Sequence, residues 1–134
     1  MINSNINTKI PEIKWGDIVL VDFGEQIDSE QCGVRPALVI QNNKGNLVSP
    51  TIIVCAITSA NKKYLPTHVE VGEEAGLKKQ SIILAEQMRT VSKNRILKKC
   101  GSVNSESLVE KIQKALTISL GLLYNNVSVS KVNC

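Results

Sequence analysis

The chain has 134 residues, a net charge of +4, four scattered cysteines and one histidine. A chain of this length can bury the core of one domain, and its cysteine spacing suggests neither a disulfide framework nor a zinc site. No stretch is apolar enough to span a bilayer, and the first residues lack the pattern of a signal peptide, so we expect a cytoplasmic protein. The mild positive charge is compatible with a polyanionic partner, although the four large aromatic residues form no base-stacking platform.

The first half of the chain predicts a lead-in followed by three strands. We expect residues 1–13 to be a flexible lead-in, 14–124 to be one folded domain and 125–134 to be a flexible tail. A polar, acidic loop separates the first two strands, and the Asn-Asn-Lys-Gly-Asn run at 42–46 predicts a turn before the third. The apolar runs that predict these strands lie at 16–23, 35–41 and 51–57.

The second half predicts shorter strands and then one helix. Strands are expected at 68–71, 81–91 (with a bend at Glu86) and 97–103, with a charged loop at 72–79 and a short turn capped by Ser92. Asn104 is the expected cap of a helix. Its apolar residues recur at helical spacing, namely Leu108, Val109, Ile112, Leu116, Leu120 and Leu123. One amphipathic helix after many short strands indicates a small, partly closed sheet with the helix packed on it.

Arg35 lies where a polar loop becomes a buried strand. Gly33 gives the backbone freedom just before this point, and Pro36 biases Arg35 towards an extended conformation. A guanidinium held at the start of a stiff strand can bind a phosphate through two parallel donors. The alternative is a structural arginine that bridges loop carboxylates such as Glu30.

Four ordered blocks carry a resemblance to a known family. In their order and spacing, over roughly residues 14 to 123, the chain resembles the MazF/PemK toxin ribonucleases of bacterial toxin–antitoxin pairs. Cys32 stands where the family usually has the first of two glycines. The blocks are Trp15-Gly16-Asp17-Ile18, Ser29-Glu30-Gln31-Cys32-Gly33-Val34-Arg35-Pro36, Ser49-Pro50-Thr51-Ile52-Ile53-Val54 leading to Ile57-Thr58-Ser59, and Leu65-Pro66-Thr67-His68-Val69 with Ser81-Ile82-Ile83-Leu84 and Glu86-Gln87-Met88-Arg89-Thr90.

The resemblance implies a mainly β fold with one helix (α+β), namely a small SH3-like barrel of the MazF/CcdB/PemK type with a C-terminal amphipathic helix. It implies a sequence-specific, metal-independent endoribonuclease that cleaves single-stranded mRNA and inhibits translation and growth. The implied partners are an acidic MazE-like antitoxin and a second copy in a homodimer. By matching positions, Arg35 and Thr58 are catalytic, and the RNA-binding residues are Ser29, Glu30, Gln31, Ser59, Ser81, Glu86 and Gln87.

The residues themselves fit this function but leave alternatives open. The aspartates are scattered and His68 is the only histidine, so we predict no metal site, no cofactor and no two-histidine mechanism. The residue that removes the 2′ proton is not assigned. Turn capping and structural polar contacts are the alternative roles of the RNA-binding set. The alternative functions are a non-catalytic toxin that poisons a protein such as DNA gyrase, and a small-barrel adaptor without toxicity.

Overall fold

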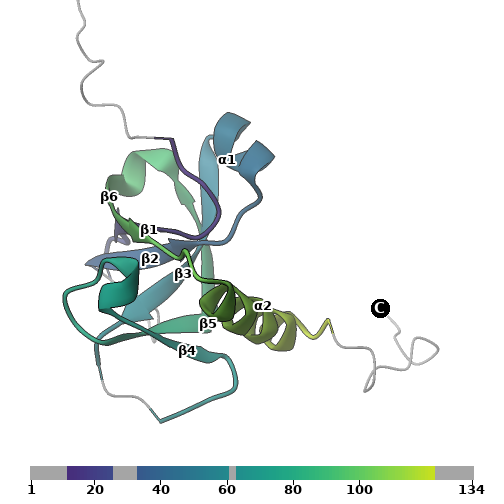
Figure 1. The fold of residues 1–134 in the computed structure, drawn as a ribbon. Helices are drawn as coiled ribbons and strands as arrows, with labels where there is room; N and C mark the ends of the chain where they lie inside the picture. Colours follow the sequence, from purple (N-terminus) through teal and green to yellow (C-terminus); the bar gives the residue numbers. More distant parts are fainter. Residues whose placement is uncertain (1–11, 26–32, 61–62, 123–134) are drawn as a thin grey trace, which may run out of the picture.

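The computed structural model describes residues 12–25, 33–60 and 63–122. Within them, six strands form one curled antiparallel sheet in the order β4-β5-β3-β2-β1-β6, with α2 packed against it (Figure 1). This confirms the predicted fold. The strands are β1 (Asp17–Asp22), β2 (Val34–Val39), β3 (Thr51–Thr58), β4 (His68–Val71), β5 (Ser81–Ser92) and β6 (Ile96–Ser102). The helices are α1 (Asn43–Val48), α2 (Glu106–Leu120) and the 3-10 turns η2 (Glu73–Ala75) and η3 (Lys93–Arg95).

The sheet has a separate apolar core on each face, because successive side chains of a strand point to opposite sides. In β1, Ile18 packs on one side and Val19 on the other. The first core lies between the sheet and α2, and it includes Leu38, Cys55, Ile57, Val69, Val71, Ile83, Leu108, Ile112 and Ala115. The second core lies inside the curl of the sheet and includes Val21, Phe23, Ala37, Val39, Ile52, Val54, Val91 and Ile96. The sheet is thus buried on both faces, as its apolar runs predicted.

The predicted turn at 42–46 is wrong, because the structure has the short helix α1 there. The Asn42 side chain caps this helix by accepting a hydrogen bond from the Gly45 N–H at 2.8 Å. Asn46 is buried, and its amide donates to the Gln41 carbonyl at 2.8 Å. Asparagine and glycine favour both turns and helix caps, so the local sequence does not separate the two.

The helix α2 begins one residue later than expected. Ser105, rather than Asn104, is its N-cap, and the Ser105 hydroxyl accepts a hydrogen bond from the Leu108 N–H at 3.2 Å. The helix ends at Leu120 with Gly121 as its C-cap, and Leu123 lies outside the described residues. None of the described helices has the length and hydrophobicity needed for a bilayer span.

The other elements agree with the prediction to within one or two residues at their ends. β2 begins at Val34 and ends at Val39, two residues before the predicted end. Ser92 caps η3, as expected, by accepting from the Asn94 N–H at 3.2 Å. The charged loop at 72–79 contains η2. β5 is one strand, and its register against β3 shifts near the predicted bend at Glu86.

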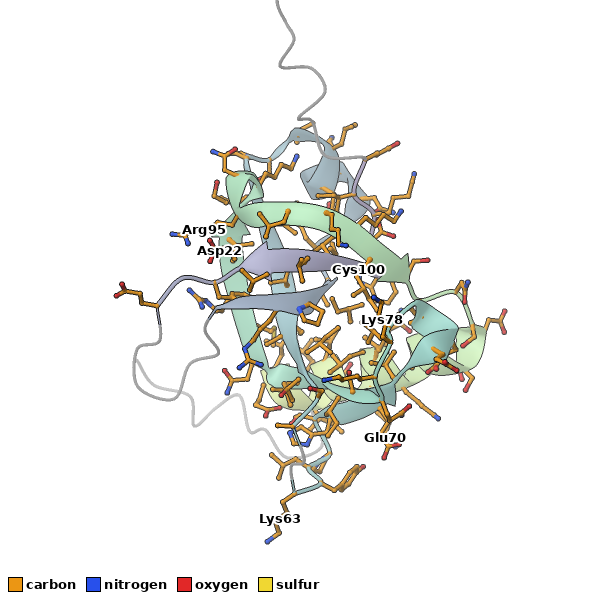
Figure 2. All side chains as sticks on the ribbon, turned by 90° about the vertical axis from the view of Figure 1, so that its left-hand side faces the viewer. Asp22, Lys63, Glu70, Lys78, Arg95 and Cys100 are labelled. Atoms are coloured by element: carbon orange, nitrogen blue, oxygen red, sulfur yellow. The ribbon has the colours of Figure 1, made fainter. Side chains whose placement is uncertain are left out.

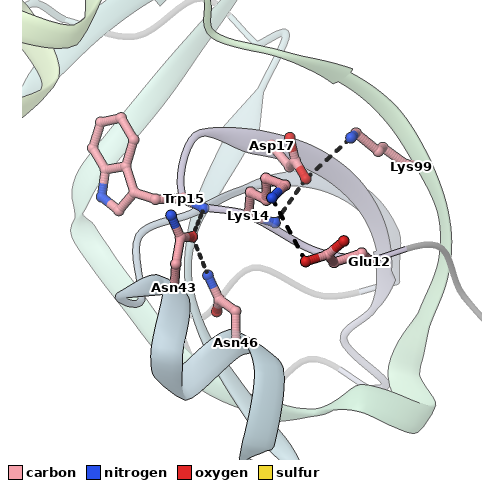
Figure 3. A network of polar contacts seen from close by, with 7 residues as sticks. All are labelled: Glu12, Lys14, Trp15, Asp17, Asn43, Asn46 and Lys99. Carbon is pink, nitrogen blue, oxygen red and sulfur yellow. Dashed lines mark hydrogen bonds and ion pairs between the residues drawn. The ribbon is translucent and has the colours of Figure 1, made fainter.

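A polar network ties the start of β1 to β6 and α1 (Figure 3). Asp17 is buried, and its carboxylate accepts from the Lys14 N–H at 2.9 Å and pairs with the Lys99 ammonium at 3.2 Å. The Trp15 N–H donates to the Asn43 side chain at 2.7 Å. These contacts lie at the end of the sheet that carries α1, away from β4, as Figure 1 shows.

The backbone of η2 lies directly on β6. Gly76 follows η2 with a φ of +95°, a conformation that a side chain would strain. A Cβ at Gly76 would lie 2.8 Å from the Cys100 carbonyl oxygen, and a Cβ at Gly101 would overlap the Ala75 carbonyl oxygen. Both positions therefore require glycine for this close approach.

Candidate active site

The two predicted catalytic residues lie at the same end of the sheet. The β2–β3 ladder pairs Ala37 with Ala56 and Val39 with Val54. Continuing this register towards the start of β2 places Arg35 directly opposite Thr58, the last residue of β3. Facing residues of antiparallel strands have Cα atoms roughly 5 Å apart and side chains on the same face. This register puts Arg35 and Thr58 on the same face at one end of the sheet.

The entry to β2 is fixed by backbone hydrogen bonds. The Phe23 N–H donates to the Gly33 carbonyl at 2.9 Å, and the Gly33 N–H donates to the Gly24 carbonyl at 2.8 Å. Gly33 has a φ of +74°, so a side chain there would be strained. This closed loop base places Arg35 two residues beyond a defined point. Ser29, Glu30, Gln31 and Cys32 lie in the same loop but outside the described residues.

An open hollow of about 680 Å³ lies beside Arg35. Its lining joins apolar side chains to serines and lysines, which are Val34, Pro36, Ile57 and Leu77 with Ser59, Ser81, Lys78 and Lys79. Strand alternation puts Pro36 and Ile57 on the α2 side of the sheet and Arg35 on the other side. Because Arg35 also lines the hollow, it lies at the edge of the hollow, where the two faces of the sheet meet. The structure brings the predicted Ser59 and Ser81 to this rim.

Thr58 lies deeper than Arg35. It is only 3% exposed, whereas Arg35 is half-buried. The Thr58 hydroxyl oxygen accepts a hydrogen bond from the Ala60 N–H at 3.1 Å. That bond fixes the oxygen and leaves the hydroxyl proton to be donated.

A second arginine lies on the same face of the sheet as Arg35. Arg89 pairs with Val54 across the β3–β5 ladder, and Val54 shares its face with Thr58. The Arg89 guanidinium carbon lies 5.1 Å from the centre of the Phe23 ring, within cation–π range. Phe23 is itself buried in the second core. The sequence gives no signal for this contact, because it forms only when the sheet curls.

The other predicted RNA-binding residues lie around a bulge in β5. Gln87 is half-buried, and the exposed Glu86 precedes it. Both carboxylate oxygens of Glu86 accept hydrogen bonds from within the protein. One accepts from the Thr67 hydroxyl at 2.7 Å, and the other lies 3.1 Å from His68 Nε2. The geometry therefore favours the structural alternative for Glu86.

Burial and hydrogen bonding shift the pKa of Glu86 in opposite directions. Burial alone would raise the pKa of Glu86, but the hydrogen bonds from Thr67 and His68, with a backbone hydrogen bond, lower it on balance. Burial and the nearby Glu86 charge raise the pKa of the Cys55 thiol to about 12. Cys55 is therefore an inert core thiol. Sequence reasoning missed the contacts of Thr67 and His68 with Glu86.

Two aspartates among the described residues, Asp17 and Asp22, already have partners within the protein. Asp17 is held by Lys14 and Lys99 at the start of β1, and Asp22, at the end of β1, accepts from the Gly24 N–H at 2.9 Å. Among the described residues, no three His, Cys, Asp or Glu side chains gather in a way that could hold a metal ion. In Figure 2, Lys78 and Asp22 lie on different sides of the molecule. The side chains that line the hollow beside Arg35 are apolar, hydroxylic and cationic, and the Asp22 carboxylate belongs to the residue opposite Val34 on β1.

Comparisons with known proteins show which family this chain belongs to. Residues 14–120 match the model of the family described as PemK-like, MazF-like toxin of type II toxin–antitoxin system. The endoribonuclease EndoA of Bacillus subtilis is 46% identical over 113 residues, which cover 83% of this chain and 97% of EndoA. A crystal structure of MazF from Deinococcus radiodurans has a TM-score of 0.70 and 27% identity, covering 84% of this chain and 98% of that one. A crystal structure of MazE–MazF from the same organism has a TM-score of 0.66 and 26% identity, covering 83% and 97%. The chain belongs to the PemK-like, MazF-like toxin family of type II toxin–antitoxin systems.

Proposed function

We propose that this toxin cleaves single-stranded RNA without a metal ion, and that Arg35 and Thr58 are its catalytic residues. The observation that carries the proposal is that Arg35, near the start of β2, and Thr58, at the end of β3, lie at the same end of the sheet, with Arg35 lining an open hollow there. The related EndoA and MazF proteins are named endoribonucleases, which supports the same activity here. This similarity disfavours the alternative of a non-catalytic toxin that poisons DNA gyrase.

The chemistry of RNA cleavage matches the two side chains. The 2′-oxygen attacks the neighbouring phosphorus in line, the phosphate gains negative charge, and the 5′-oxygen leaves with a proton. The Arg35 guanidinium binds two phosphate oxygens and stabilises the added charge. The Thr58 hydroxyl donates a hydrogen bond to the same phosphate and fixes its orientation. No described side chain is assigned as the base that removes the 2′ proton.

The hollow beside Arg35 fits the nucleotide next to the cleaved phosphate. Its apolar floor suits the face of a base, and single-stranded RNA exposes base edges to the polar groups around it. Ser59 and Ser81 lie at this hollow, and Gln87 lies further along β5, the strand that begins at Ser81. Lys78 and Lys79 add positive charge at the rim. Together with Ser29, Glu30 and Gln31, these residues form the proposed RNA-binding set.

The direct test incubates the purified protein with a long RNA in excess EDTA. We expect discrete fragments whose mapped 5′ ends share one short sequence. Cleavage that stops in EDTA and returns with magnesium would contradict the metal-independent mechanism. Intact RNA together with a bound and inhibited topoisomerase would instead support the protein-poisoning alternative. Unchanged RNA with no effect on growth when the protein is expressed would support the adaptor.

The proposal includes two partners. The first is a second copy of the chain, since large apolar side chains remain exposed, among them Val34, Leu47, Val48 and Leu65. A two-fold dimer would bury part of this surface. We expect a dimer by sedimentation at micromolar concentration, and a monomer there would contradict it.

The second partner is an acidic, MazE-like antitoxin. One related structure contains MazE with MazF, and the rim of this hollow is basic. A flexible acidic segment could fold along this rim and exclude RNA by overlap. We expect an acidic antitoxin peptide to compete with an uncleavable RNA. Simultaneous binding of both, with no mutual weakening, would contradict the overlap.

A further inference from the structure

The strand β5 bulges where it pairs with the last part of β3, between Cys55 and Ile57. The ladder pairs Ile57 with Ile83 on one side of the bulge and Cys55 with Met88 on the other. One residue of β3, Ala56, therefore lies opposite four of β5, which are Leu84, Ala85, Glu86 and Gln87. The β3 ladder cannot hold so many extra residues, so other contacts must fix the shape of the bulge.

The backbone of the bulge is held from two other elements. The Ala85 N–H donates to the Thr67 carbonyl, just before β4, at 2.9 Å. The Ala85 carbonyl accepts from the Ser119 hydroxyl of α2 at 2.9 Å. Both backbone groups of Ala85 are therefore satisfied by contacts that β3 does not provide.

The side chain of the next residue is held as well. The Thr67 hydroxyl donates to Glu86 Oε1 at 2.7 Å, and His68 Nε2 lies 3.1 Å from Glu86 Oε2. An ionised carboxylate only accepts hydrogen bonds, so His68 Nε2 carries the proton in this pair. The other ring nitrogen, Nδ1, is buried without a partner, and it is the one such side-chain atom among the described residues. The His68 side chain is 5% exposed. It therefore acts as a fixed donor, at the expense of an unsatisfied buried nitrogen.

This arrangement connects the bulge to the proposed chemistry. Ile82, before the bulge, pairs with Thr58, and Gln87 directly follows Glu86. The shape of the bulge thus sets the position of Gln87 relative to Thr58. We propose that Thr67 and His68 are positioning residues for RNA cleavage, which hold the bulge through Glu86 and thereby place Gln87 beside the Arg35–Thr58 pair. This inference rests on the proposed function.

The test compares two substitutions of His68 in the full-length protein. In His68→Gln, the amide nitrogen can occupy the place of Nε2 and keep the hydrogen bond to Glu86. In His68→Leu, the volume is retained but the donor is removed. We expect His68→Leu to lower kcat/KM for RNA by about tenfold and His68→Gln to stay within about threefold of the parent, since a small misplacement of contact groups is enough to slow catalysis. Thr67→Val should resemble His68→Leu.

A matched control separates positioning from stability. Asn46→Ala removes a buried polar contact to Gln41 at the α1 end of the sheet, away from the bulge. It should lower the melting temperature without lowering kcat/KM at a temperature where the protein is folded. Equal losses of kcat/KM in Asn46→Ala and His68→Leu, at equal stability, would show that His68 only stabilises the fold.

A second readout does not depend on cleavage. Nitrogen NMR of the parent should show a proton on His68 Nε2, and the amide signals of Gln87 and Thr58 should move in His68→Leu but not in His68→Gln. Unchanged signals would overturn the inference. A parent that leaves RNA intact would overturn the proposed function, whereas a cleaving parent with an equally active His68→Leu would overturn the positioning role alone.

Discussion

The two ends of the β2–β3 pair differ in the exposure of their polar side chains, although Thr58 and Ser81 are buried at the second end. At the α1 end, Gln41 and Asn46 are buried and bonded to each other at 3.2 Å, and the Gln41 amide also donates to the Thr51 carbonyl at 3.0 Å. At the other end, Ser59 and Lys78 are exposed beside an open hollow, and Val34 is 53% exposed.

This difference separates residues that hold the fold from residues that are left for a ligand. Buried polar groups must find partners within the protein, so the hydrogen-bonding groups of Gln41 and Asn46 at the α1 end are used within the fold. An exposed apolar residue beside cationic and hydroxyl groups gains little from folding, and it can gain from binding. The comparison therefore predicts that substitutions at the two ends affect different properties.

The largest effect is expected for Arg35→Ala. Removing a group that stabilises charge in the transition state should lower kcat/KM by a hundredfold or more, or about 3 kcal/mol. Arg35→Lys should recover little, because a point charge cannot replace two parallel donors. The measurement is RNA cleavage by variants whose melting temperature matches the parent. An alanine variant that cuts at the parental rate would make Arg35 a structural residue.

A smaller loss is expected for Thr58→Val, which keeps the shape and removes the hydroxyl. We expect kcat to fall by roughly tenfold to a hundredfold, since the phosphate has one donor fewer. The Ala60 N–H also loses its acceptor, so stability should fall by about 1 kcal/mol. Thr58→Ser, which keeps the hydroxyl, is the matched control. Equal kcat values for the valine and serine variants would contradict a catalytic hydroxyl.

A weaker effect is expected for the lysines at the rim. Replacing Lys78 and Lys79 by alanine should raise KM a few-fold and reduce the salt dependence of RNA binding, by a slope of about 0.7 for each phosphate that is no longer neutralised. The same change at the exposed Lys111 and Lys114 of α2 is the control. If both pairs change the slope equally, the lysines provide only diffuse attraction.

The smallest effect concerns acid stability. The pKa of Glu86 is lowered in the folded protein, so its contribution to stability is present above the ordinary carboxyl pKa and is lost as pH falls through the folded value. We expect Glu86→Gln to unfold with less pH dependence than the parent in the acidic range, measured by denaturant midpoints. Parallel midpoint curves for the two proteins would argue against this linkage.

Local patterns were sufficient to predict the strands and α2, because apolar runs and helical spacing report burial directly. Arg35 beside Pro36 was also recognisable, since the proline restricts the backbone there. The short helix α1 was missed because asparagine and glycine favour turns as well as helix caps, so the local sequence did not separate the two.

The contact of His68 with Glu86 was equally invisible in the sequence. It joins residues on two strands and exists only because β5 bulges at that point. The bulge is predictable as a bend, but the partner of Glu86 depends on how β4 lies across it. The same reasoning applies to Arg89 and Phe23, which meet across the curl of the sheet. Site details of this kind require the three-dimensional arrangement.

The close backbone approach at Gly76 and Gly101 has a consequence for how this toxin can lose its activity. The loop that bears Leu77 and Lys78 follows Gly76 directly, so its position depends on the backbone contact with β6 as well as on the packing of Ala75 and Leu77 in the first core. One added methyl group at Gly101 would act as a wedge between Ala75 and β6 and push this loop outward. Among cells that survive expression of the toxin, inactivating mutations should therefore include a position that carries no functional group and touches no RNA.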